Sequence, residues 1–317
     1  MRYAWIDAQR DVYPLARTCT LLEVARSGYY AWRARQQQPS PRTQENAQLL
    51  VELQTRHRRH RGCYGSPRMT ADLQAAGWAV NRKRIARLMR SAGLRARGRC
   101  RRQGTTDSRH SWPIAPNRVA QRFTAAAPNQ LWVTDITYVA TDEGWLYVAL
   151  VMDLFSRKFV GWAVEACVDC RLTLAALRMA LGLRQPDHTL IHHSDRGVQY
   201  AAAEYRAVLE ARGIALSMSR KGNCYDNAPM ESANGTLKTE RVYAQQYHTR
   251  AAAKRDLIDY VGYYNTERRH SALGYVSPTE FETRWTASRR TSAASTRDEK
   301  AGTGIQTDER SPVVGSL

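Results

Sequence analysis

Residues 131–139 read LWVTDITYV, a strand-forming run of aromatic and β-branched residues with one acid, Asp135, in its middle. A turn sequence, TDEG (141–144), and two further apolar runs, WLYVALVMD (145–153) and KFVGWAVEA (158–166), follow, which predicts three consecutive strands. The first two runs are apolar at nearly every position, as in strands buried on both faces. Because a charged side chain is rarely buried alone, Asp135 needs a proton, a cation or a place at the rim of the sheet.

The pattern after these strands alternates between helices and strands. In order, it predicts a helix (171–183), a strand (188–193), a helix (202–212), a short strand (214–218), a polar loop and a helix from about Asn227. Asp195 follows the fourth predicted strand directly, and α/β sheets commonly carry their chemistry at the carboxyl ends of strands. Glu231 lies in the last predicted helix.

Asp135, Asp195 and Glu231 would supply three carboxylates from two strands and one helix. Such a set is what a two-metal phosphoryl-transfer site needs, in which two Mg²⁺ ions about 4 Å apart activate the attacking oxygen and stabilise the leaving one. Mg²⁺ prefers oxygen ligands and keeps several waters, so a few carboxylates suffice. Each acid alone could be a surface or capping residue, but their joint placement favours two Mg²⁺ ions, which Mn²⁺ can replace.

The charge of the chain is concentrated in one region. There are 48 Lys and Arg residues against 29 Asp and Glu, a formal net charge of +19, and residues 51–110 alone hold 16 basic and 3 acidic residues. This local excess favours a polyanionic partner such as double-stranded DNA.

No run of residues is both apolar and long enough to span a bilayer, so no membrane partner is expected. The first residues, MRYAWIDAQRD (1–11), lack the apolar core of a secretion signal, so the cytoplasm is the expected location.

The basic stretch has the pattern of a helix-turn-helix. Ser66-Pro67 predicts the start of one helix, Gly77 its end, and Asn81 and Gly93 the two caps of a second helix. The second helix has an apolar face and a cationic face, formed by Ile85, Leu88 and Met89 and by Lys83, Arg87 and Arg90 respectively. A recognition helix in the major groove fits this pattern. A solvated basic helix over a small core is the alternative, and the regional charge favours DNA.

Composition divides the chain into five segments. They are an N-terminal helical segment (1–41), a basic helix-turn-helix domain (42–103), a linker (104–122), a catalytic core (123–285) and a disordered tail (286–317). Residues 14–34 are a second helix-turn-helix candidate, although packing of their aromatic residues in a small core is the simpler interpretation.

Four motifs together resemble those of a known family. WVTDITY with Asp135, HSDRGVQY with Asp195 and DNAPMESANGTLKTE with Glu231 resemble the catalytic triad of DDE transposases and retroviral integrases, and 35 residues separate the second and third acids. YVGYYNTERRHSALGYVSPTEF (260–281) resembles the C-terminal signature of bacterial insertion-sequence transposases. YGSPR (64–68) and RIARLMRSAGL (84–94) resemble the helix-turn-helix segment before that core. The likeness covers about residues 5–285.

The resemblance implies an α/β fold with a ribonuclease H-like core, a mixed five-stranded sheet with flanking helices, after a helix-turn-helix region. It implies a nucleoid-associated bacterial enzyme that cleaves the ends of a mobile element and joins the freed 3′-hydroxyls to target DNA, without a covalent protein intermediate. The implied partners are element ends, target DNA, further copies of the chain on DNA, and an upstream-frame protein or fusion. Lys238 lies where the family places a basic residue. Lys221, Lys238 and Arg196 are expected to contact DNA phosphates.

Two other functions use the same residues differently. A ribonuclease H-like nuclease would share the carboxylates but would cut DNA without joining it. A decayed copy of the element would bind DNA as a repressor without catalysis. Arg268, Arg269 and His270, in the C-terminal signature, could contact DNA or fix the last helix in place.

Overall fold

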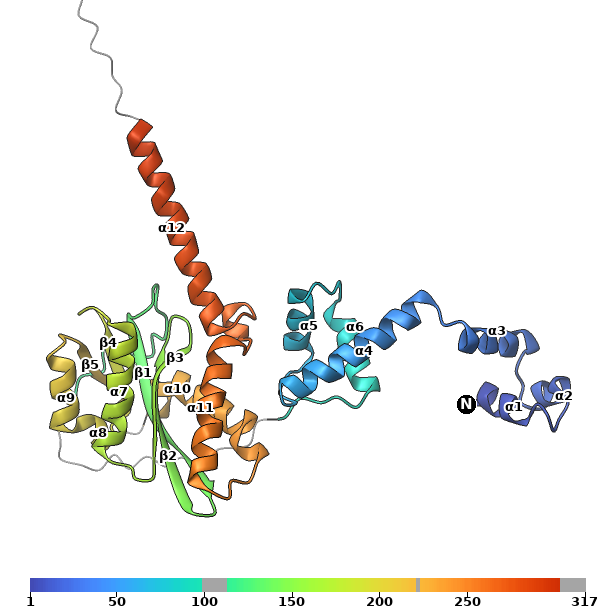
Figure 1. The fold of residues 1–317 in the computed structure, drawn as a ribbon, viewed down its shortest axis with the longest axis horizontal. Coiled ribbons are helices and arrows are strands. Elements are labelled where there is room, and N and C mark those ends of the chain that lie inside the picture. Colours follow the sequence, from blue (N-terminus) through green and yellow to red (C-terminus); the bar gives the residue numbers. More distant parts are fainter. Residues whose placement is uncertain (99–112, 221–222, 303–317) are drawn as a thin grey trace, which may run out of the picture. The chain divides into compact units, whose positions relative to one another are not determined.

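The structure, a computed structural model, describes residues 1–98, 113–220 and 223–302, with side chains up to Thr291 except that of Cys224 (Figure 1). The chain forms two compact units, Met1–Ala96 and Arg97–Leu317. The described part of the first unit is helical and that of the second unit combines a sheet with helices.

The first unit contains six helices. They are α1 (Arg2–Gln9), α2 (Leu15–Leu21), α3 (Arg26–Gln37), α4 (Pro41–Arg59), α5 (Ser66–Ala75) and α6 (Arg82–Ser91). Ile6, Cys19 and Tyr29 form a small core for α1 to α3, and the Tyr29 hydroxyl donates a hydrogen bond to Asp7 Oδ1 at 2.7 Å. Residues 14–34 therefore lie in two helices joined by a turn, with Tyr29 buried and Trp32 packed against the same core, whereas Tyr30 is 56% exposed.

The helices α4, α5 and α6 share a second apolar core. It contains Leu49, Leu53, Tyr64, Met69, Leu73, Val80, Ile85 and Met89. Asn81 caps α6 as predicted, because its Oδ1 accepts a hydrogen bond from Arg84 N at 2.9 Å. Gly77, with a φ of +88°, makes the turn after α5 in a conformation that favours glycine.

A five-stranded mixed sheet is the centre of the second unit. Its strands are β1 (Leu131–Thr141), β2 (Gly144–Asp153), β3 (Lys158–Glu165), β4 (Ile191–Ser194) and β5 (Ala215–Met218), in the order β3-β2-β1-β4-β5. The pairs β1–β2 and β2–β3 are antiparallel, and β1–β4 and β4–β5 are parallel. This is the sheet that the sequence predicts.

Helices cover both faces of this sheet (Figure 1). One face packs against α7 (Cys170–Arg184), α8 (Val198–Ala201) and α9 (Ala203–Glu210), and the other packs against α10 (Ala228–Glu240) and α11 (Arg250–Thr266). Gly161 on β3 allows α7 to approach closely, since a Cβ there would lie 2.2 Å from the Ala176 carbonyl oxygen. Two apolar faces explain why β1 and β2 are apolar at nearly every position.

The last described helix, α12 (Pro278–Gly302), differs from the sequence prediction. Composition predicts a disordered tail from residue 286, but the helix continues through residues 286–302, where four Ala and three Arg residues favour helix. Residues 303–317 lie outside the described part. Near its start, Glu282 accepts two hydrogen bonds from Arg184, at 2.7 and 2.9 Å, and the same guanidinium contacts Asp153.

Candidate active site

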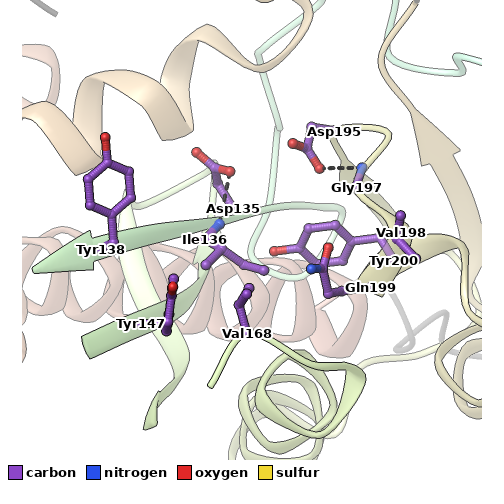
Figure 2. Close-up of a pocket in the computed structure, with 10 residues that line it drawn as sticks. All are labelled: Asp135, Ile136, Tyr138, Tyr147, Val168, Asp195, Gly197, Val198, Gln199 and Tyr200. Carbon is purple, nitrogen blue, oxygen red and sulfur yellow. Dashed lines mark hydrogen bonds between the residues drawn. The ribbon is translucent and has the colours of Figure 1, made fainter. Parts of the chain in front are cut away.

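The register of β1 and β4 places Asp135 and Asp195 side by side. Val133 pairs with His193 in the parallel ladder, and each acid lies two residues further along its own strand direction. Both acids line one pocket at the carboxyl end of β4, and their carboxylates point into the same region (Figure 2). Gly197 N donates a hydrogen bond to Asp195 Oδ1 at 2.9 Å, and a Cβ at this glycine would lie 3.0 Å from that oxygen. The glycine therefore leaves room for the Asp195 carboxylate.

The helix α10 brings Glu231 to Asp135. Met230, Ala233 and Leu237 are buried against the sheet, which fixes the face of α10 that meets β1. Asn234, one turn after Glu231, donates a hydrogen bond from Nδ2 to Asp135 Oδ2 at 2.8 Å. Glu231 is close enough to Asp135 for its charge to affect the proton affinity of that carboxyl.

The electrostatics of Asp135 reflect this crowding. Burial, the Asp195 carboxylate and the Glu231 carboxylate raise the pKa of Asp135 to about 8, whereas hydrogen bonds from Ile136 N and Asn234 lower it. A carboxyl beside two others retains its proton unless a cation neutralises the group. Carboxylate oxygens are the ligands that divalent ions such as Mg²⁺ prefer. Asp135, Asp195 and Glu231 are the residues that would hold such ions here.

The three acids do not form a closed ligand shell in the structure. In the described ranges, no three His, Cys, Asp or Glu side chains are grouped as closely as a ready-made metal site requires. The residues fit Mg²⁺ by type and by shared location, and Mg²⁺ usually keeps several waters in place of protein ligands.

Asp226 fixes the start of α10 in a way that the sequence does not predict. The N-cap residue of α10 is Asn227, and Asp226, just before it, accepts hydrogen bonds from Arg220, Asn117 and Gln121. These bonds, with the Arg220 guanidinium first, lower the pKa of Asp226 far below its usual range. Asp226 therefore ties the segment before β1 to the loop that leads to Glu231.

His192 and His193 are structural. Both are buried, and burial together with His193 lowers the pKa of His192 to about 3. His193 contacts Ser217 Oγ and the Asp226 carbonyl oxygen, both at 2.9 Å, and the Tyr205 hydroxyl contacts His192 at 3.2 Å. Neither ring lines the pocket of Asp135.

The predicted DNA-contacting residues lie in different settings. Lys83, Arg87 and Arg90 are exposed on α6, whereas Ile85 and Met89 on its other face are buried, as the periodicity predicts. Arg196 donates a hydrogen bond from Nε to the Ser219 carbonyl oxygen at 2.6 Å.

Lys238 and Lys221 are the two other residues expected at phosphates. The Lys238 ammonium lies 4.0 Å from the centre of the Tyr138 ring, beside the pocket. Lys221 lies outside the described residues. No contact of these residues with DNA is tested by the structure, so each remains a prediction.

The C-terminal signature contributes to packing through Arg268. This buried guanidinium makes two hydrogen bonds to Glu240 at the end of α10, at 2.8 and 2.7 Å, and Tyr260 donates a third to Glu240 at 2.9 Å. The sequence leaves two roles open for Arg268, a DNA contact or the fixing of a helix. The structure shows the second role, because Arg268, just after α11, is bonded to Glu240 at the end of α10.

Three domain-family models match the chain. Residues 125–224 and 212–278 match integrase core domain families, and residues 44–104 match an HTH-like domain. The fold and the matches define an integrase-core protein with a helix-turn-helix-like domain.

Curated relatives define the family more closely. The chain is 45% identical to the insertion element IS600 uncharacterized 31 kDa protein of Shigella sonnei, over 84% of this chain and 98% of that protein. It is 38% identical to the transposase InsF for insertion sequence IS3A of Escherichia coli, over 89% of this chain and 98% of that protein. The chain therefore belongs to the family of insertion-sequence transposases that includes InsF, which confirms the resemblance seen in its motifs.

Solved structures give more remote likenesses. A simian T-cell lymphotropic virus intasome chain is 15% identical, with a TM-score of 0.44 over 69% of this chain and 70% of that chain. The HTLV-2 integrase catalytic core in complex with magnesium is 14% identical, with a TM-score of 0.41 over 50% of this chain and 99% of that chain.

Within the described residues, no helix is both long and apolar enough to cross a membrane.

Proposed function

We propose that this transposase cuts the ends of its own mobile element and joins them to target DNA by attack of a 3′-hydroxyl on a phosphodiester. The observation that supports the proposal is that Asp135 and Asp195 line one pocket and that the Glu231 carboxylate is near enough to raise the pKa of Asp135. Phosphodiesters resist attack because their charge repels nucleophiles. A site that gathers three carboxylates around bound cations overcomes this repulsion.

Asp135, Asp195 and Glu231 would hold two Mg²⁺ ions, or Mn²⁺ in their place, and the ions would supply charge neutralisation at the reacting phosphate. Asn234 orients the Asp135 carboxylate through its hydrogen bond and keeps one of its oxygens in a fixed position. The hydrogen bond from Gly197 N does the same for Asp195. These contacts would keep the Asp135 and Asp195 carboxylates oriented while the ions bind.

The helix α6 would recognise the element ends in the major groove, with Lys83, Arg87 and Arg90 on its exposed face. Lys238, Lys221 and Arg196 would hold phosphates near the metals. We further propose that several copies of the chain act together on nucleoid DNA, because two element ends must be joined to one target. An upstream-frame protein, separate or fused, remains part of this proposal.

Strand joining by the purified chain tests the function. Duplexes from the DNA that flanks its gene would be incubated with target DNA and Mg²⁺, and joined products would be separated by size. Asp135→Asn, Asp195→Asn and Glu231→Gln should each lower joining by about 10³-fold or more while DNA binding is retained. Asp187→Asn, which changes an exposed acid of the same unit, should join like the wild type.

The two alternatives predict different products. A nuclease without transferase activity would cut the duplexes and form no joined product under any metal condition. An inactive derivative would bind the duplexes and give neither product. Either result from the wild-type chain would contradict the proposal.

A further inference from the structure

The turn between β2 and β3 holds an arginine, Arg157, in an unusual setting. Its side chain is half-buried, yet within the described residues its guanidinium makes no hydrogen bond and no ion pair. Burial lowers the pKa of this guanidinium, because a cation that is partly removed from water and not paired with a carboxylate is poorly stabilised. Buried charges are normally paired, so Arg157 needs a partner that the described part of the chain does not provide.

Two acids lie next to this turn, and both are bound to other cations. Glu282 accepts hydrogen bonds from Arg184 and from Lys158. The Asp153 carboxylate, at the end of β2, accepts a hydrogen bond from the same Arg184 guanidinium. Arg157 directly precedes Lys158 but contacts neither acid, so these carboxylates leave its positive charge available to a ligand.

The backbone of Arg157 is strained as well. Its φ of +60° lies in the left-handed region, which glycine adopts readily and arginine adopts rarely. A glycine would therefore form this turn with less strain. A strained backbone at an unpaired charge is typical of a side chain that binds a ligand rather than one that supports the fold.

An exposed arginine face of α12 lies beside this turn. Phe155, in the turn, packs against Phe281 and Trp285 of α12, with ring centres 5.2 and 5.3 Å apart. Arg289, one helical turn after Trp285, is exposed, and its guanidinium lies 5.2 Å from the centre of the Trp285 ring. Residues 283–291 contain three arginines and no acid. The turn and this face of α12 therefore form one basic surface.

The ligand of this basic surface must be an anion with several binding points. A planar guanidinium binds the paired oxygens of a phosphate or a carboxylate. Separate arginines along one surface fit a row of anions better than a single acid, and the DNA backbone is such a row. We propose that Arg157 and Arg289 bind phosphates of double-stranded DNA, whatever its sequence. The inference rests on the proposed function for its ligand and assigns a contact that neither α6 nor the metal site makes.

The basic surface lies away from the proposed metal site. Asp153, just before the turn, pairs with Trp132 near the start of β1, whereas Asp195 follows the end of β4, which runs parallel to β1. Phosphates bound at Arg157 are therefore not the ones that react. Contacts of this kind add affinity and orient the duplex without taking part in the chemistry.

Filter binding of the full chain to a random-sequence duplex, at several salt concentrations, tests the inference. Arg157→Gln should lower the affinity by about 10-fold and the magnitude of the slope of log affinity against log salt by about 1. Arg157→Lys, which keeps the charge, should retain the slope. Arg289→Gln, at an exposed position, should lower the slope by about 1, and the double variant by about 2. Arg171→Gln, at a side chain that is 90% exposed, should bind like the wild type.

Urea unfolding separates a ligand contact from a structural role. Arg157 has no acid partner among the described residues, so Arg157→Gln should unfold at the same urea concentration as the wild type. Arg157→Asn should unfold at the same or a higher concentration, because asparagine tolerates the left-handed backbone. A lower midpoint in Arg157→Gln with an unchanged DNA affinity would show that Arg157 supports the fold, and the inference would be wrong.

Joining assays keep the two proposals apart. If the wild-type chain joins DNA, Arg157→Gln should need about 10-fold more DNA for half-maximal joining, with the same maximal rate. An unchanged salt slope and DNA requirement would remove the basic surface from the DNA interface and leave the proposed function standing. A changed oligomeric mass with an unchanged slope would assign Arg157 to an acid of a second copy and overturn the inference. If the wild type joins no DNA but Arg157→Gln lowers the slope, the proposed function fails and the inference stands.

Discussion

Asn234 on α10 donates a hydrogen bond to the Asp135 carboxylate on β1 at 2.8 Å, although the two residues are 99 positions apart in the chain. The bond ties the helix that carries Glu231 to the strand that carries the first acid.

Removal of this bond should weaken metal binding rather than unfold the protein. Asn234→Ala leaves the Asp135 carboxylate without its side-chain donor, and loss of such a supporting contact typically lowers metal affinity or activity by about 10-fold to 100-fold. Joining rates measured against Mg²⁺ concentration should shift to higher Mg²⁺. Thr236→Ala, which removes an exposed hydroxyl of the same helix, is the control. An unchanged Mg²⁺ dependence in Asn234→Ala would contradict this role.

Mg²⁺ binding should depend on pH through Asp135. The pKa of this carboxyl is raised to about 8, so the metal-free protein is protonated there at neutral pH, and the metal must displace the proton. Affinity should therefore rise up to about tenfold per pH unit below pH 8 and level off above it. Calorimetric titrations in two buffers of different ionisation enthalpy should show about one proton released at pH 7. A flat affinity with no proton release would refute the prediction.

The buried pair of Arg268 and Glu240 should be essential for stability. Arg268→Met leaves the Glu240 carboxylate buried and without its guanidinium, which costs about 3–5 kcal/mol when one partner of such a pair is removed. Urea unfolding should show this loss. Arg171→Met, at a guanidinium whose side chain is 90% exposed, should change the unfolding free energy by less than about 0.5 kcal/mol. If Arg268→Met is as stable as the wild type and binds DNA less well, Arg268 is a DNA contact instead.

DNA binding by α6 should show the salt dependence of phosphate contacts. Replacement of Lys83, Arg87 and Arg90 together by Ala should lower the magnitude of the slope of log affinity against log salt by up to about 3, roughly one for each lost contact. Filter binding at several salt concentrations measures the slope. Arg171→Ala, at an exposed arginine of the second unit, is the control for loss of a positive charge outside α6. An unchanged slope in the triple variant would remove α6 from the DNA interface.

Strands and acids could be predicted from the sequence because their patterns are local. The apolar runs around Asp135 predict buried strands, and a strand that ends before Asp195 puts this acid at the rim of the sheet. The exposed basic face of α6 follows equally from helical periodicity. In these cases the residues that determine the structure lie within one strand or helix, so the element can be predicted without knowledge of tertiary contacts.

Other contacts depend on the tertiary fold and could not be read from the chain. Two of the residues that donate hydrogen bonds to Asp226, Asn117 and Gln121, lie more than 100 positions before it in the chain. The hydrogen bond from Asn234 to Asp135 forms only because α10 packs on β1. Tyr138, Val168 and Gln199 line one pocket only when the sheet is assembled. Helix α12 continues past residue 286, where Ala and Arg residues favour helix although the low apolar content predicts disorder.

The central claim is that Asp135, Asp195 and Glu231 together hold a pair of divalent ions. Anomalous diffraction from crystals of the wild-type chain soaked in Mn²⁺, measured at the manganese edge, tests it most directly. The account predicts two peaks about 4 Å apart, in contact with all three carboxylates. A single peak that touches only one of these acids, or no peak beside Asp135, would contradict it.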